Sequence, residues 1–218
     1  MPVVGTITTW SHSAYNGPGQ QITLKVWRKT AGNTYRVIGH DGPRTPVAGV
    51  DNTFFNNISI PVQPGDVLGL NRGSAASACL FSAAGETSLF NGSVNTPDNG
   101  TATFSPLSNY RVNVTAVVQP SNAFTTGAIT RNKKRGTATV SITVPNPGTL
   151  VVTGGGVKPV SLSGTGAIDV PIVAGNKKNG RRLRSTGKVT IKPAITYTPN
   201  AGISRTGHLT VTLRKKIT

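Results

Sequence analysis

The chain has 218 residues and a formal net charge of +17, from 23 Lys and Arg against six Asp and Glu. A single cysteine, Cys79, excludes a disulfide-stapled scaffold and a cysteine-based zinc site, and no apolar run is long enough to predict a transmembrane helix. The 26 Gly and 15 Pro are typical of short strands joined by tight turns. These totals favour an all-β protein with one large domain or two smaller ones.

Residues 1–119 are expected to form an antiparallel β-sandwich that is similar to a jelly roll. Apolar and polar residues alternate over 22–28, and the Gly32-Asn33 turn leads into a second strand-like run at 34–40, which predicts a β-hairpin. We expect about eight short strands in this domain. The segment 83–106, rich in Gly, Ser and Asn, is predicted to be a long irregular loop of the kind that carries binding surfaces.

Residues 127–218 are expected to form an immunoglobulin-like sandwich of seven strands, joined to the first domain by a linker at 120–126. The alternating run 137–144 is predicted to end at a Pro-Asn-Pro-Gly turn. Segments rich in Lys and Arg are predicted to be loops, because no helical periodicity persists over three turns. Pro171 and Pro193 cannot donate to a ladder, so their strands are predicted to lie at a sheet edge or to carry a bulge.

Positive charge is concentrated in the second half. Residues 1–120 hold seven Lys and Arg against five acids, whereas residues 121–218 hold sixteen against one acid, Asp169. The second domain is therefore predicted to bind anionic partners such as nucleic acid, acidic polysaccharide, teichoic-type polymer or anionic lipid. The residues expected to bind polyanion are the cations of three clusters: Arg131, Lys133, Lys134, Arg135, Lys177, Lys178, Arg181, Arg182, Arg184, Arg214, Lys215 and Lys216.

Generic affinity, governed by salt, is expected of these clusters rather than sequence-specific recognition of nucleic acid. The second half offers only Phe124 and Tyr197 as aromatic side chains and no predicted helix that could enter a groove. A structural explanation also exists, because basic residues on strands and loops discourage edge-to-edge aggregation.

Acid–base and metal chemistry have little support in the sequence. His40-Asp41 is the only adjacent pair of a histidine and an acid, and its neighbour Gly42-Pro43 predicts a solvated turn. Asp51-Asn52 and Asp98-Asn99 could offer oxygens to calcium, but no Asp-x-Asp ladder accompanies them. We therefore expect no enzymatic activity, no cofactor and no bound metal.

The aromatic residues of the first half offer a candidate sugar-binding platform at Trp27 and Tyr35, since Trp27 lies on the strand face opposite the apolar residues of 22–26. A tryptophan in a sandwich more often belongs to the core. The apolar neighbours of Cys79 predict a buried structural thiol, because a nucleophile needs a nearby base that stabilises its thiolate.

A family resemblance covers most of the chain. The Lys/Arg-rich start of 131–148, its Gly-Thr-Ala-Thr-Val strand and its Val-Pro-Asn-Pro-Gly-Thr-Leu run, with the basic segments 176–184 and 214–216, resemble a C-terminal module of secreted or surface-associated actinobacterial proteins. The segments 24–28 and 60–69 are similar to the β-sandwich that often precedes that module. The family has no assigned activity, so the resemblance implies an extracellular location and carries over no functional residue.

These observations predict a non-enzymatic, extracellular structural or adhesive protein whose basic C-terminal domain associates with an anionic polymer of the cell envelope. The alternatives are a carbohydrate-binding module and a structural subunit of a capsid or surface appendage. Residues 1–4 lack the features of a signal peptide, so the protein is either cytosolic or a mature form. With the extracellular location that the resemblance implies, we expect that the signal peptide has been removed from this chain. The oligomeric state stays open.

Overall fold

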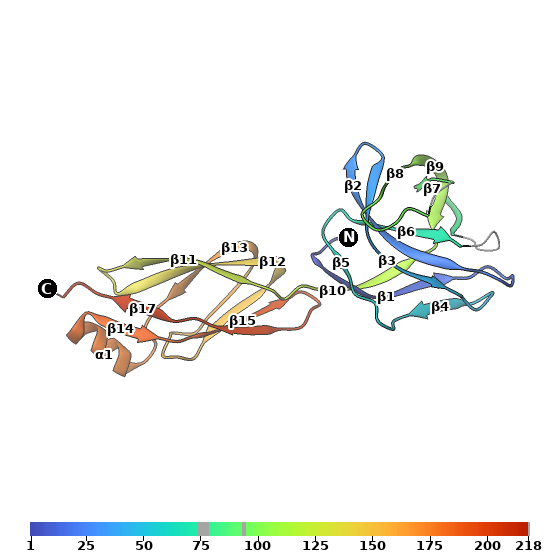
Figure 1. The fold of residues 1–218 in the computed structure, drawn as a ribbon. Coiled ribbons are helices and arrows are strands. Elements are labelled where there is room, and N and C mark those ends of the chain that lie inside the picture. The colour runs from blue at the N-terminus through green and yellow to red at the C-terminus, as the bar shows by residue number, and fades with distance from the viewer. Residues whose placement is uncertain (74–78, 93–94, 218) are drawn as a thin grey trace. The chain divides into compact units, whose positions relative to one another are not determined.

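The computed structural model describes residues 1–73, 79–92 and 95–217. About 61% of the chain is strand and 5% is helix, so the predicted all-β class is confirmed. The chain folds as two compact units, Met1–Gln119 and Pro120–Thr218 (Figure 1). The strand β10 continues to Pro120 and β11 begins at Thr125, so the segment between strands is shorter than the linker predicted at 120–126. The jelly-roll-like and immunoglobulin-like topologies stay predictions.

The described residues of the first unit form three sheets. The first has the order β10-β1-β4, with β5 also pairing with β1; the second has the order β6-β2-β3-β8; and the third is the hairpin of β7 and β9. The strands are β1 (Gly5–Ser13), β2 (Ile22–Ala31), β3 (Thr34–Arg44), β4 (Asp51–Phe54), β5 (Ile60–Val62), β6 (Val67–Arg72), β7 (Leu80–Phe90), β8 (Thr101–Thr103), β9 (Ser105–Val112) and β10 (Thr115–Pro120).

The irregular loop predicted for 83–106 is wrong over much of its length, because β7, β8 and the start of β9 occupy it. Most residues of β7 and β9 are exposed. Strands with two largely solvated faces lack the apolar alternation that identifies a strand in a sequence. The predicted hairpin of 22–28 and 34–40 is present as β2 and β3.

The strand β2 lies between β3 and β6 in the sheet. Both of its faces are buried over Ile22–Trp27, because a hydrophobic cluster packs on each face. Ile22, Leu24 and Val26 pack into the core that also contains Trp10. On the other face, Trp27 packs with Tyr35 and with side chains of β7 and of the segment between β8 and β9. The second face of this sheet is therefore covered rather than solvated.

Over residues 120–217, the second unit contains seven strands and one helix. Its main sheet has the order β11-β12-β15-β16, with β13 pairing with β12, and β14 pairs with β17. The elements are β11 (Thr125–Asn132), β12 (Thr137–Thr153), β13 (Val160–Ile172), α1 (Lys177–Thr186), β14 (Lys188–Ile191), β15 (Ala194–Pro199), β16 (Arg205–His208) and β17 (Val211–Arg214).

The strand β12 organises this unit. Its first part pairs with β11, its last part pairs with β15, and β13 pairs with both parts. A register shift between Val144 and Gly148 lies where the sequence predicts a turn, so the two expected strands are one interrupted strand. Pro171 lies in β13, whose ladder partner within the described residues is β12, in line with the predicted edge position. Pro193 falls between β14 and β15.

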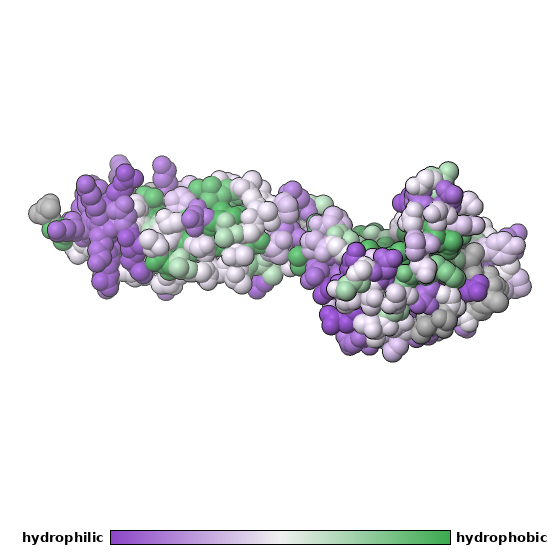
Figure 2. Space-filling model, turned by 90° about the horizontal axis from the view of Figure 1, so that it is seen from above, coloured by the Kyte–Doolittle hydropathy of each residue, from purple (hydrophilic) through white to green (hydrophobic). Residues whose placement is uncertain are grey.

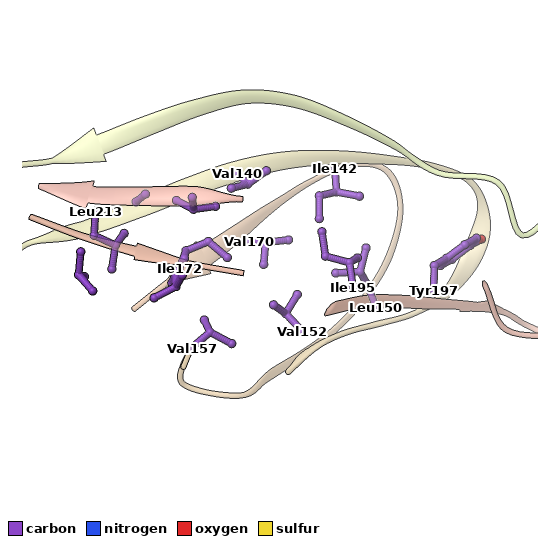
Figure 3. Packing of buried hydrophobic residues seen from close by; sticks show 14 of the residues in the cluster. Val140, Ile142, Leu150, Val152, Val157, Val170, Ile172, Ile195, Tyr197 and Leu213 are labelled. Atoms are coloured by element: carbon purple, nitrogen blue, oxygen red, sulfur yellow. The ribbon is translucent and has the colours of Figure 1, made fainter. Parts of the chain in front are cut away.

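Alternation along β12 builds the core of the second unit. Every second residue from Ala138 to Val152 is buried, and these side chains meet apolar residues of β13, β14, β15 and β17 (Figure 3). The fully buried Tyr197 donates its hydroxyl proton to the carbonyl oxygen of Asn146 at 2.6 Å, within the interruption of β12. A search of the described residues finds no helix with the length and apolar character needed to span a membrane.

Candidate polyanion-binding site

The three predicted basic clusters meet at one end of the second unit. The backbone N–H of Lys216 donates to the carbonyl oxygen of Lys133 at 2.8 Å, which joins the segment after β17 to the turn between β11 and β12. The N–H of Lys215 donates to the carbonyl of Gly187 at 2.8 Å, which joins the same segment to the end of α1. Clusters about forty and eighty residues apart in the sequence therefore form one surface.

Side-chain contacts fix the same junction. Arg131 donates from Nε to the carbonyl oxygen of Thr212 at 2.9 Å, linking β11 to β17. Gly136 is buried in the turn after the first cluster, and a Cβ atom at this position would lie 2.9 Å from Cδ2 of Leu183 in α1. This close approach, with a φ of 71°, requires glycine and packs the turn directly against the helix.

We define the basic pole as the twelve predicted cations together with Lys188, which sequence reasoning missed. Figure 2 shows strongly hydrophilic residues gathered over the end of the second unit that carries α1 and the C-terminal segment. Lys215 is half-buried and the other members of the basic pole are exposed. The sequence signal for Lys188 is its closeness to the second basic cluster, which it follows after three residues, Ser185-Thr186-Gly187. In the structure it lies in β14, directly opposite Arg214 of β17.

The second basic cluster was predicted to be a loop, and this is wrong because residues 177–186 form α1. Asn176 caps the helix by accepting the N–H of Asn179 at 2.7 Å on its side-chain oxygen, and Gly187 ends it in the left-handed conformation. Leu183 is the buried anchor. A single apolar residue gives no periodicity, so the two caps are the signal that marks this helix in the sequence.

The exposed face of α1 carries five cations. At ~100° per residue, they cover an arc of about 160° centred roughly opposite Leu183, shared only with Ser185. The cations on this arc are Lys177, Lys178, Arg181, Arg182 and Arg184. The first helical turn contains no acidic residue, so Lys177 and Lys178 lie near the positive end of the helix dipole.

Like charges in this pole repel one another. Lys177 and Arg181 are four residues apart on α1, as are Lys178 and Arg182, and such pairs destabilise a helix. Lys188 and Arg214 are directly opposite across the β14–β17 ladder, another unfavourable arrangement. No cation in the described part of the second unit forms an ion pair. The pole is therefore a surface of uncompensated positive charge.

The predicted sugar platform is wrong, because both rings are buried rather than exposed. Trp27 and Tyr35 are each 8% exposed. Phe104 packs edge-on against both, with ring centroids 4.9 Å from Trp27 and 5.7 Å from Tyr35. The cover over this face comes from β7 and the segment after β8, which the alternation of β2 alone does not reveal.

The histidine and the acid of the His40-Asp41 pair have different partners. His40 lies in β3 rather than in a turn, and its Nδ1 is 2.8 Å from Oδ1 of Asp98. Asp41 accepts the indole N–H of Trp10 at 2.6 Å and two N–H groups of Arg44, so it has a structural role. Among the residues that the structure describes, no group of three or more His, Cys, Asp or Glu could hold a metal ion.

Comparison of the chain with protein-family models, with curated proteins and with solved structures finds no match.

Proposed function

We propose that this is a non-enzymatic, extracellular structural or adhesive protein whose basic pole associates with an anionic polymer of the cell envelope. The observation that carries the proposal is the meeting of three basic segments at one end of the second unit. Their cations are not paired with acids in the described residues, so an anionic partner would relieve their mutual repulsion as well as bind them. In this proposal the first unit is a recognition or structural module.

An extended polymer suits the basic pole better than a small anion. Most of its cations lie on a turn, a helix face and the segment after β17, three lie on strands, and all but Lys215 are exposed. Small ligands are usually held in concave sites that bury most of their surface. A polymer that carries a charge on each repeat can instead contact many exposed cations at once and release its counterions.

Recognition of the polymer backbone is favoured over the reading of bases. The side-chain oxygens of Asn132 and Asn176 cap local backbone, and Asn179 donates to the carbonyl of Gly156, so these three amides are engaged within the fold. The segments that carry the pole, 131–136, 176–188 and 214–217, contain no aromatic residue on which a base could stack. The sequence predicted no helix that could enter a groove of DNA, but the structure contains α1. Binding to duplex DNA must therefore be measured as well.

The test is binding of the full chain to long-chain polyphosphate, measured by calorimetry as salt rises from about 50 to about 500 mM. We expect a logarithmic slope of affinity against salt of about −4 or steeper. Replacement of Lys133, Arg182 and Lys216 by Gln should weaken binding and reduce the slope by up to about three. The matched control replaces three exposed cations outside the pole by Gln: Lys158, Lys192 and Arg205.

The outcomes separate the candidates. Equal binding at both salt concentrations, or equal losses in the pole variant and its control, would show that the basic pole is not the site. Tighter binding to a random-sequence DNA duplex, by more than about tenfold per phosphate, would replace the envelope polymer by nucleic acid as partner. Large particles or filaments in light scattering would support the alternative of a capsid or appendage subunit.

A further inference from the structure

The first unit contains a cavity of about 690 Å³ that the basic pole does not involve. It lies between the second sheet and the β7–β9 hairpin, on the face of β2 that carries Lys25 and Trp27. This volume falls in the range of small-molecule sites. Apolar side chains line part of it, among them Trp27, Leu89, Phe90 and Phe104.

Glycine makes room for an aromatic wall at this cavity. Gly69 of β6 is the cross-strand neighbour of Lys25, and a Cβ atom at this position would lie 2.7 Å from Nε1 of Trp27. Any larger residue would displace the indole, so the bare backbone of β6 lets the ring lie flush against the strand. The cavity therefore has an aromatic side formed by Trp27.

A polar site adjoins this wall. Lys25 is only 4% exposed, and its ammonium group donates to the carbonyl oxygen of Thr96. Thr96 is 3% exposed, and its hydroxyl oxygen has no hydrogen-bond partner in the described residues. Both residues line the cavity. Burial lowers the pKa of Lys25, while Asp98 acts in the opposite direction, so the ammonium group is less well solvated than an exposed lysine.

The charge of the lining specifies the sign of a ligand. Lys25 and Arg72 are its cations, and no Asp or Glu is among its described lining residues. Asp98, whose charge favours the protonated form of Lys25, has its Oδ1 2.8 Å from Nδ1 of His40. A ligand acid group would meet a buried ammonium and an unpartnered hydroxyl, and its apolar body would replace the solvent beside the aromatic wall.

We propose that this cavity binds an organic anion with an apolar, ring-sized body, whose acid group contacts Lys25 and Thr96. The probe is 2-naphthoate, and its neutral counterpart is naphthalene-2-carboxamide. The chain has two tryptophans, so indole N–H signals in two-dimensional NMR report separate places. Trp27 lines the cavity, whereas Trp10 is bonded to Asp41 in the other core. Naphthoate should shift the Trp27 signal to saturation and leave the Trp10 signal in place.

Three substitutions test the chemistry. Wild-type protein should bind naphthoate at least about tenfold more tightly than the amide, the expected gain from one charge-assisted hydrogen bond. Lys25→Met should reduce that ratio to about one, and the exposed control Lys29→Met should preserve it. Thr96→Val should weaken naphthoate binding while Lys25 keeps its backbone partner, and Ala102→Leu should fill the cavity and block both probes.

The refuting results are equally specific. Absence of a Trp27 shift at millimolar naphthoate, equal affinity for acid and amide, or an unchanged ratio in Lys25→Met would overturn the proposal. If Lys25→Met does not fold, Thr96→Val decides the matter, because unchanged naphthoate affinity in that variant would exclude the assigned polar site. These outcomes do not depend on the basic pole, so they stand apart from the polyanion experiment.

Discussion

Replacing one arginine of α1 should make the second unit more stable and its polyanion binding weaker. Arg181 has Lys177 four residues before it, Lys178 three residues before it and Arg184 three residues after it. Each like-charged pair at these spacings destabilises a helix by ~0.2–0.5 kcal/mol. Gln has nearly the helix propensity of Arg, so Arg181→Gln should remove three repulsions and stabilise the unit by about 0.6–1.5 kcal/mol at low salt.

The helix is coupled to the core through Leu183, so its stability contributes to that of the unit. Both tryptophans lie in the first unit and do not report this unfolding. Urea unfolding should therefore be followed by hydrogen exchange of the buried β12 amides at ~0.01 M salt, where the Debye length is about 30 Å. At ~1 M salt it falls to about 3 Å and the difference should largely disappear.

The matched control is Lys192→Gln, which removes an exposed cation that follows β14 and lies outside both α1 and the basic pole. It should leave the free energy of unfolding nearly unchanged. If Arg181→Gln is instead neutral or destabilising at low salt, the cations of α1 do not repel one another as their spacing implies. If it gains stability but keeps full affinity for polyphosphate, the outer face of the helix is not part of the binding surface.

Three further predictions follow from particular contacts. Lys188→Glu should convert repulsion with Arg214 into attraction, stabilising the second unit by ~0.2–1 kcal/mol in the same urea assay; a loss of stability would contradict this. Tyr197→Phe should cost ~0.5–1.5 kcal/mol, because it removes the buried hydrogen bond from the Tyr197 hydroxyl to the carbonyl of Asn146, and a neutral result would show that this bond does not stabilise the unit. Burial raises the pKa of the Cys79 thiol to about 11 from 9.0, so fewer thiolates form at neutral pH. The thiolate fraction falls about a hundredfold, but a thiolate of higher pKa is also a stronger nucleophile. Iodoacetamide should therefore modify native Cys79 roughly tenfold more slowly than the unfolded chain, with a rate that still rises above pH ~9; a native rate that levels off at that pH would refute the burial argument.

The alternation of apolar residues predicted the strands well where one face is buried and the other is solvated. In β12, every second residue from Ala138 to Val152 meets the core, as the sequence pattern implies. The interruption within β12 was mistaken for a turn because its stabilising partners are distant in the chain. The hydroxyl of Tyr197 reaches the carbonyl of Asn146, and the Asn146 side chain bonds the carbonyl of Ser121. Local turn propensity carries no information about such contacts.

The candidate sites also depend on contacts that the sequence does not reveal. The residue types and net charge of the basic pole follow from the sequence, but its assembly depends on backbone bonds such as that between Lys216 and Lys133. Trp27 was a candidate for exposure because alternation assumes one solvated face, whereas Leu89 of β7 and Phe104, which follows β8, pack over it. Contacts between segments distant in the chain therefore bury Trp27, and other such contacts bring the basic segments together.

The distribution of charge argues for binding rather than for solubility or edge protection. A soluble surface is best made by interspersing cations and acids, which avoids repulsion. Here the pole instead concentrates its cations around α1, where the repeated spacing makes them repel one another. Arg131, Lys188 and Arg214 lie on strands, where charge can protect an edge, but most of the pole lies in a turn, a helix and the segment after β17. Neither structural explanation accounts for the cations of α1, whereas the proposed binding of a polymer with repeated negative charges does, because the polymer would relieve their repulsion.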